Sequence, residues 1–147
     1  MAKSIENMIF ANEAEYNSTQ QLSSNNQMEI KTHQINGQKI AEVTAEGLII
    51  ATIGDGTDLI GNLYYQDFDK VIIYEKNITP DFFDLKTGIA GEILQKFSTY
   101  RMRLAIVGDF SKYPGKSLKD FIYESNKAGR INFLSTTSEA LDRLTHD

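Results

Sequence analysis

The amino-acid sequence predicts a mixed α/β domain in which a β-hairpin is followed by alternating strands and helices. The hairpin is indicated by two alternately apolar and polar segments on either side of Asn36-Gly37, a dipeptide whose residues readily take the positive φ angles of a tight turn. After the hairpin, short apolar runs alternate with segments of helical periodicity. This alternation is typical of parallel strands joined by right-handed crossovers, so we expect a single sheet covered by helices.

The composition is that of one globular domain. The chain has 147 residues, 41% of them hydrophobic, and 15 lysines and arginines against 20 acidic residues give a net charge of −5. This acidic balance argues against a general nucleic-acid or anionic-membrane binder, which would carry a basic face, so neither partner is expected. The absence of cysteine excludes disulfides, thiolate metal sites and a cysteine nucleophile. We find no secretory signal and no run of the roughly 18–20 apolar residues that a membrane span needs, and therefore expect a cytoplasmic protein.

The chain divides into an N-terminal extension, residues 1–27, and a folded domain, residues 28–147. Residues 17–27 are polar except for Leu22. Such a segment cannot bury enough apolar surface to offset an ordering cost of roughly 1–2 kcal/mol per residue. We therefore expect residues 1–27 to be a flexible extension or linker and the ordered structure to start at Met28.

The first half of the domain contains four predicted strands and one predicted helix. Residues 28–35 and 38–43 form the hairpin, residues 48–53 a third strand at an edge or a bulge, and residues 71–74 a continuous apolar strand covered on both faces. Between the last two strands lies a helix, for which Asp55 or Thr57 can serve as the N-cap. The apolar side of this helix consists of Leu59, Ile60, Leu63 and Tyr64.

The second half continues the alternation. Thr79-Pro80-Asp81 is a helix start in which Thr79 provides the cap, Pro80 takes the first position and Asp81 meets the positive end of the helix. We expect this helix to run on through an apolar set from Phe82 to Phe97. The remaining elements are a central strand over 103–107, a helix from Ser117 that Gly129 stops, a strand over 131–134 and a last helix with the capping-box spacing Thr136-x-x-Glu139.

Several segments of the domain are similar to one known family. They are Ile35–Val43, Asn62–Gln66, Glu75–Leu94 and Ala105–Phe110. Together they resemble a small bacterial family that is described only as a domain of unknown function, and the resemblance covers nearly all of residues 28–147. It implies a bacterial protein and brings no activity, cofactor or site residue with it.

The order of elements also resembles the STAS domain, named for sulfate transporters and anti-sigma-factor antagonists. In that family a strand leads through a loop to a helix whose first turn holds a phosphorylatable serine, commonly in an Asp-Ser-Ser-Gly setting. The corresponding loop here runs from Glu75 to Thr79, and its nearest hydroxyls are those of Thr79 and Thr87. The resemblance implies a STAS-like sheet and makes these two threonines candidate modification sites, although neither lies in an Asp-Ser-Ser-Gly setting.

Three loops are expected to meet at the carboxyl ends of the strands, where open α/β sheets bind their ligands. The candidate ligand or interaction residues in and after these loops are Asp55, Thr57, Glu75, Lys76, Asn77, Thr79, Asp81, Asp109, Phe110 and Ser111. Glycines in the loops and the helix starts after them could present backbone N–H groups to a phosphate. The alternative is that the glycines are turn residues and the aspartates are helix caps.

Metal binding and catalysis receive little support from the residue pattern. Asp55, Glu75 and Asp109 could supply oxygen ligands to Mg²⁺, but acidic residues at strand ends are common, and we expect neither a metal nor a cofactor. The only histidines are His33, on the first strand, and His146, next to the last residue. No spacing suggests a catalytic triad, so we expect no catalytic residues.

Aromatic residues near the same loops favour an interaction surface. Phe82 and Phe83 cannot both face one core if they lie in a helix, because adjacent helical residues diverge by about 100°. Phe110 and Tyr113 flank a lysine in a loop. Exposed aromatic side chains beside charges suit a protein interface, although a loop aromatic can also fold back onto the sheet.

The leading functional hypothesis is a non-enzymatic protein-interaction or regulatory module of STAS-like type. It would use residues 75–81, the helix after them and residues 110–113, with Thr79 as a position where a helix start could stabilise an added phosphate. The protein partner is unknown, and a homodimer could form through the exposed edge of the hairpin. The alternative is a binder or converter of a small anionic or nucleotide-like ligand at the strand ends. That site would consist of Asp55, Thr57, Lys76, Asp109 and Ser111.

Overall fold

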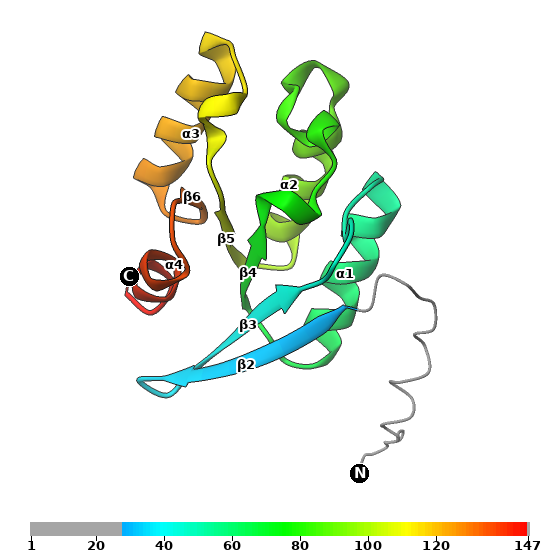
Figure 1. Cartoon of the computed structure of the whole chain (residues 1–147). Coiled ribbons are helices and arrows are strands. Elements are labelled where there is room, and N and C mark those ends of the chain that lie inside the picture. The colour runs from blue at the N-terminus through cyan, green and yellow to red at the C-terminus, as the bar shows by residue number, and fades with distance from the viewer. Residues whose placement is uncertain (1–27, 147) are drawn as a thin grey trace.

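The computed structural model describes residues 28–146, which form a five-stranded sheet flanked by helices (Figure 1). The predicted extension over residues 1–27 lies outside the described residues. The strands are β2 (Glu29–Ile35), β3 (Gln38–Thr44), β4 (Lys70–Tyr74), β5 (Arg103–Val107) and β6 (Ile131–Leu134). The helices are α1 (Ile53–Tyr65), α2 (Ile89–Thr99), α3 (Lys116–Ala128) and α4 (Thr137–Leu144).

The order of strands across the sheet is the order along the chain, β2-β3-β4-β5-β6. β2 and β3 pair antiparallel through the turn at Asn36 (φ 54°) and Gly37 (φ 75°), which confirms the predicted hairpin. β3, β4, β5 and β6 run parallel to one another. The structure therefore confirms a mixed α/β fold with an N-terminal hairpin followed by strand–helix alternation.

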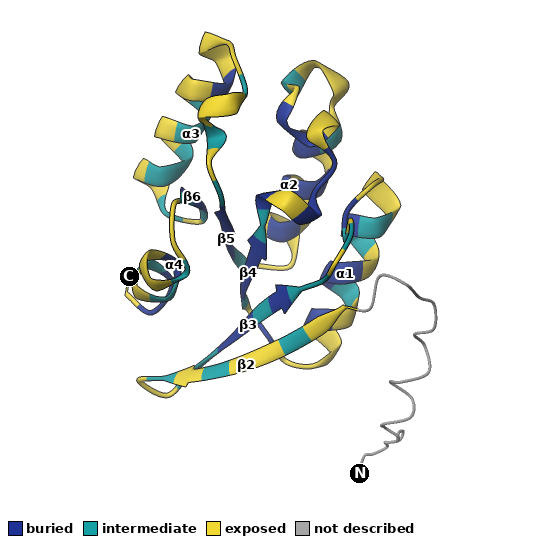
Figure 2. Cartoon of the chain, in the orientation of Figure 1, coloured by how far each residue is buried: buried dark blue, intermediate teal, exposed yellow. Residues whose placement is uncertain are grey.

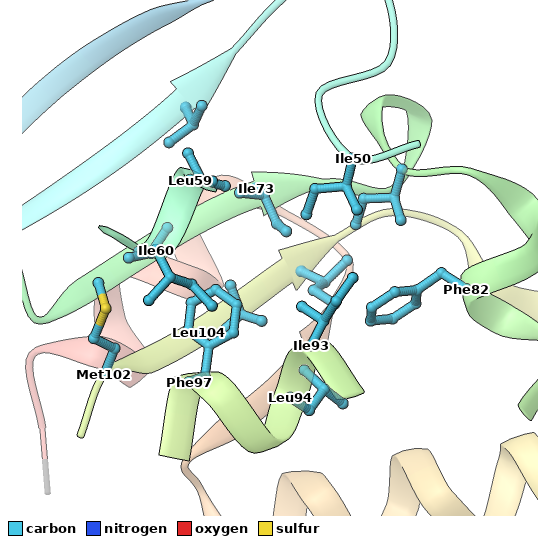
Figure 3. Close-up of a cluster of buried hydrophobic side chains, with 14 of the residues drawn as sticks. Ile50, Leu59, Ile60, Ile73, Phe82, Ile93, Leu94, Phe97, Met102 and Leu104 are labelled. Atoms are coloured by element: carbon cyan, nitrogen blue, oxygen red, sulfur yellow. The ribbon is translucent and has the colours of Figure 1, made fainter. Parts of the chain in front are cut away.

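The helices form two unequal layers. The strands follow one another across the sheet in chain order, and crossovers between parallel strands are right-handed. As a result, α1, α2 and α3 all lie on the same face of the sheet. Adjacent residues of the central strand separate the two cores: Ile73 belongs to the large core under these three helices, and Ile72 belongs to a smaller core under α4. Figure 3 shows the large core and Figure 2 the buried central strands between the two layers.

Residues 48–53 do not form the predicted strand. The described chain shows a single bridge here, between Ile50 and Ile78, and the amide of Ile49 donates to the carbonyl of Asn77 at 2.7 Å. The run is apolar because Ile50 is buried in the large core from a loop, not because it adds a strand to the sheet. The side chain of Asn77 fixes that loop by donating to the carbonyls of residues 45 and 47 at 3.0 and 2.8 Å.

The predicted N-cap position of the first helix was also wrong, although Asp55 does take part in the cap. Helix α1 begins at Ile53 and is capped by Thr52, whose hydroxyl accepts from the amide of Asp55 at 3.1 Å. The carboxylate of Asp55 accepts in return from the amide of Thr52, so the two residues form a capping box. Thr57 lies inside the helix and donates to the carbonyl of Ile53.

A continuous helix from Pro80 to Phe97 is not formed. The chain makes two short 3₁₀ turns, Pro80–Phe83 and Leu85–Thr87, before α2 starts. Gly88 interrupts the run because it takes a left-handed conformation with φ of 81°. The predicted cap at Thr79 is confirmed, since its hydroxyl accepts from the amide of Asp81 at 3.3 Å. Phe82 and Phe83 are both buried, contrary to the helical argument, because the irregular backbone lets their rings pack edge to face at 5.0 Å.

The predicted ends of the last two helices are confirmed. Gly129 follows α3 in a left-handed conformation with φ of 87°, and Thr136 and Glu139 form the capping box of α4. None of the helices in the described part of the chain is long and apolar enough to cross a membrane.

We expect Thr136→Ala to lower the free energy of unfolding by about 1 kcal/mol, because it leaves the N-terminal amides of α4 without their side-chain acceptor. Urea unfolding followed by circular dichroism measures the change. The control is Ser138→Ala, two residues further on and also exposed, which should stay within about 0.5 kcal/mol of wild type. Equal loss in both variants would show that the cap does not stabilise the domain.

Candidate functional site

The carboxyl ends of the central strands are covered by one buried acidic residue. Glu75 directly follows β4, is 8% exposed, and packs over Gly108, which directly follows β5. The approach is so close that a Cβ atom on Gly108 would overlap the Cβ of Glu75. The position where open α/β sheets usually receive a ligand therefore holds a carboxylate of the protein itself.

Two residues of the next loop neutralise this carboxylate. Lys112 Nζ lies 3.0 and 3.2 Å from the two oxygens of Glu75, and the hydroxyl of Tyr113 donates to Oε2 at 2.5 Å. Burial raises the pKa of Tyr113, and its hydrogen bond to Glu75 and the negative charge of that residue raise it further. The three side chains form a closed cluster that ties the loop after β5 to the end of β4.

A groove lies beside this cluster, with a volume of about 820 Å³. We call it the carboxyl-edge groove. One wall is the segment Pro80–Lys86 and the other is Tyr113–Leu118. The two walls meet where the ring of Tyr113 stacks on that of Phe83, with centroids 4.6 Å apart and planes at 18°. Charged residues of both signs also line it: Asp81, Asp84, Lys86 and Lys116.

Four of the predicted site residues lie in or around this edge. Asp81 lines the groove, and Glu75 holds Tyr113 of the opposite wall. Phe110 is half-buried between Phe83 and Phe133, with ring centroids 5.8 and 5.3 Å away, and is therefore not the exposed aromatic that the loop position suggested. Lys76 is exposed.

The other predicted site residues hold local structure. Asp109 accepts from the amide and the hydroxyl of Ser111 at 3.0 and 2.7 Å, and these two bonds lower the pKa of its carboxyl group. Asn77 is buried and fixes the loop over residues 45–50, and Asp55 is the partner of Thr52 in the capping box of α1. Among residues 28–146, no three histidine or acidic side chains lie close enough together to hold a metal ion.

The two candidate modification sites differ in accessibility. Thr79 is 8% exposed, and its hydroxyl serves as a cap. Thr87 is exposed next to the groove wall, and its hydroxyl donates to the carbonyls of Asp81 and Asp84 at 2.8 and 2.9 Å.

A polar chain on the α4 side of the sheet was not predicted. Glu42 of β3 accepts from the hydroxyl of Tyr74 at 2.6 Å and lies 2.8 Å from Nε2 of His33, which makes His33 a partnered strand residue. The same tyrosine hydroxyl lies 2.6 Å from that of Thr137, the first residue of α4. The signal in the sequence was the period-two spacing that puts Glu42 on the same face of β3 as Ile40, which is buried beneath α4.

We expect Tyr113→Phe to lower the free energy of unfolding by about 1.5–3 kcal/mol, since it removes a donor to the buried carboxylate of Glu75. Tyr123→Phe is the matched control because Tyr123 is 64% exposed. It should change stability by less than about 0.5 kcal/mol. Chemical denaturation of both variants is the measurement, and equal stabilities would contradict the role of the cluster.

Glu42 makes the stability of the fold depend on pH in the acidic range. Burial alone would raise its pKa, but hydrogen bonds from Tyr74 and His33, with the charges of His33 and Lys31, outweigh burial and hold the pKa below the ordinary 4.5. A lowered folded-state pKa stabilises the native state fully above the ordinary value, and this contribution disappears as the pH falls through the folded-state pKa. We therefore expect wild type to lose stability below about pH 4.5 more steeply than Glu42→Gln.

Denaturant unfolding at a series of pH values from 7 to 3 measures this difference. Glu46→Gln is the control because Glu46 is exposed and lies two residues after the end of the same strand. A pH profile of Glu42→Gln that superimposes on the wild-type profile would contradict the prediction.

Comparisons with known proteins identify a family and no activity. The family model described as "Domain of unknown function (DUF4180)" matches residues 35–144. No curated protein and no solved structure matches the chain. The predicted resemblance to a domain of unknown function is thus confirmed, and the resemblance to STAS domains stays a prediction.

Proposed function

The chain belongs to the DUF4180 family, and from that premise we propose that it is a non-enzymatic protein-interaction module, regulatory and STAS-like in type, working in the cytoplasm of a bacterium. Its binding surface would be the carboxyl-edge groove. The observation that carries the proposal is that parts of both segments expected to form an interaction surface lie on opposite walls of this groove. Asp81 lines it from the first segment and Tyr113 from the second.

The chemistry of the groove suits a protein segment. Phe83, Leu85, Tyr113, Pro114 and Leu118 give it an apolar and aromatic lining, as in the centres of protein interfaces. The acidic and basic residues that line it as well can pair with polar groups on either side of an apolar anchor. We propose that the occupant is a peptide segment that inserts an apolar side chain against the stacked rings of Phe83 and Tyr113.

The Glu75 cluster supports the proposal because it fixes the groove before a partner arrives. Tyr113 is held by both its hydroxyl bond to Glu75 and its stacking on Phe83. A wall that is already ordered costs less conformational entropy on binding. The regulatory part of the proposal would act through Thr87, which is exposed and whose phosphorylation would add negative charge beside Lys86.

The test is selection of binding peptides from a random-sequence display library against the full chain. We expect enriched peptides to share an apolar anchor and to shift the amide resonances of residues 80–86 and 113–118. Leu85→Asp, inside the groove, should weaken their binding at least about tenfold. Leu48→Asp places the same charge on an exposed leucine that does not line the groove, and should leave binding intact.

Two results would overturn the proposal. One is a library from which no peptide is enriched. The other is equal weakening of binding by Leu85→Asp and Leu48→Asp, which would mean that the peptides bind elsewhere.

A small anionic or nucleotide-like ligand is the second candidate for the same edge. It is favoured by helix α3, whose first turn lines the groove and has no side-chain cap and no acidic residue. It is disfavoured by the carboxylate of Glu75 at the strand ends and by Asp55, which is used as a cap. A thermal-shift panel of phosphorylated metabolites separates the two, because a ligand at 100 times its Kd adds about 2.7 kcal/mol of stability.

A further inference from the structure

A second pocket lies at the opposite edge of the sheet, where β5 and β6 begin. Its volume is about 450 Å³, and the C-terminal ends of α3 and α4 border it. The charged and titratable residues of its lining are Arg103, Lys127, Arg130, Arg143 and His146, and among residues 28–146 no acidic residue lines it. Four positive charges around one small pocket contrast with the net charge of −5 of the whole chain.

Arg103 forms the inner side of this pocket and neutralises the helix ends. Its guanidinium donates to the carbonyl of Gly129 after α3, at 3.3 and 3.0 Å. It also donates to three carbonyls at the end of α4: those of Arg143, Leu144 and His146, at 3.1, 3.3 and 3.1 Å. These five bonds use all five N–H groups of an arginine. Arg103 therefore offsets the negative ends of both helices, which would otherwise repel an anion, but has no N–H group left for a ligand.

Arg143 does have donors left. One terminal nitrogen of its guanidinium is held by the side-chain oxygen of Asn132 at 2.7 Å and by the carbonyl of Asn126 at 3.3 Å. These bonds fix the plane of the group. Its other two nitrogens have no hydrogen-bond partner among residues 28–146, and neither is a buried unpartnered atom. They remain available to an anion in solution.

Lys127 and Arg130 complete the pocket with two exposed cations. They lie on the chain just before and after Gly129, where α3 ends. Neither forms a salt bridge with an acidic residue in the described part of the chain. The lining thus holds one oriented guanidinium and two exposed cations, one of which (Lys127) also lies over the ring of Tyr123, beside the half-buried guanidinium of Arg103.

We infer that this pocket binds the phosphoryl group of a small phosphorylated molecule. A planar guanidinium can bind two oxygens of a phosphate side by side, while ammonium and guanidinium groups on flexible stems adjust to the others. A phosphoryl group near neutral pH carries close to two negative charges, which suits a pocket of several cations better than a single carboxylate does. The volume leaves room for a small organic part beside the phosphate. The site is separate from the carboxyl-edge groove and does not depend on the function proposed for it.

The probes are inorganic phosphate, pyrophosphate and glycerol phosphate, titrated into the full chain at low ionic strength. Calorimetry and the side-chain Nε–H resonance of Arg143 give the readout. We expect saturable binding with a Kd below about 1 mM that weakens as sodium chloride is added. The double variant Lys127→Gln/Arg130→Gln should weaken binding at least about tenfold without unfolding the domain, since both side chains are exposed. Arg143→Lys should weaken it as well, because an ammonium cannot replace a bidentate guanidinium.

The matched control is Lys96→Gln/Lys119→Gln, which removes the same charge from exposed positions outside the pocket. It should leave the Kd unchanged. The inference is overturned if none of the probes binds saturably, if the control weakens binding as much as the pocket variant does, or if Lys127→Gln/Arg130→Gln binds like wild type. Binding that is lost with Lys86→Gln and kept in the pocket variants would instead assign the anion to the carboxyl-edge groove.

Discussion

Gly108→Ala is expected to destabilise the domain by about 1–3 kcal/mol, as overpacked cores are. The added methyl would overlap the Cβ of Glu75 and lie 3.2 Å from its Oε1. A Cβ atom is fixed to the backbone and cannot swing aside, so the end of β4 would have to move. That movement would also pull the carboxylate away from Lys112 and Tyr113. Urea unfolding should show a lower midpoint.

Gly61→Ala is the matched control and should have the opposite sign. Gly61 lies inside α1, and an added Cβ would have no heavy atom within 4 Å. Alanine is favoured over glycine in a helix interior by about 1 kcal/mol, so this variant should be more stable than wild type. If Gly108→Ala unfolds at the wild-type urea concentration, Glu75 does not pack across the end of β5.

The parts of the fold that could be predicted are those that a local turn or cap motif determines, or that follow from the general rules of parallel sheets. The Asn36-Gly37 turn, Gly129 after α3 and the capping box of α4 each follow from two to four neighbouring residues. The strands β4 and β5 are continuous apolar runs because both faces are covered, which is the rule for parallel strands. Because the strands lie across the sheet in chain order, right-handed crossovers then place α1, α2 and α3 on one face.

Two of the wrong predictions, the strand over residues 48–53 and the continuous helix from Pro80, have a common physical cause. An apolar run shows that side chains are buried but does not say which backbone shape buries them. Ile50 reaches the core from a loop held by Asn77, and Phe82 and Phe83 reach it from a 3₁₀ turn. In the first place Asn77 fixes the backbone from 30 and 32 residues further along the chain, and in the second Gly88 interrupts it by its left-handed conformation, so neither leaves a periodic signal.

The candidate site was predictable in location and not in chemistry. Parallel strands bring their carboxyl ends to one edge, so Glu75 and residues 109–113 were expected to meet. The sequence could not show that Lys112 and Tyr113 would bind Glu75, because a contact across 37 or 38 residues depends on the close approach at Gly108. The basic pocket is even harder to predict from the sequence, because its residues come from three separate places: β5, the end of α3 and the end of α4.

Arg103→Leu is expected to have the largest effect, a loss of about 3 kcal/mol in the free energy of unfolding. The leucine would leave the carbonyls of three residues at the end of α4 without their charged donor, whereas the carbonyl of Gly129 would keep its hydrogen bond from the side-chain amide of Asn132. Each buried acceptor left unsatisfied costs about 1–3 kcal/mol, and water can reach only part of this half-buried position. Hydrogen exchange should show the amides at the ends of α3 and α4 opening first.

Arg103→Lys and Arg130→Gln separate the possible causes. Lysine keeps the charge but has three donors and a flexible stem, so it should recover less than half of the lost stability. Arg130→Gln removes an exposed charge from the same pocket and should change stability by less than about 0.5 kcal/mol. If Arg103→Lys is as stable as wild type, positive charge alone holds the two helix ends. If Arg130→Gln is as damaging as Arg103→Leu, the positive pocket as a whole stabilises the fold, and the division between a structural Arg103 and ligand-facing cations fails.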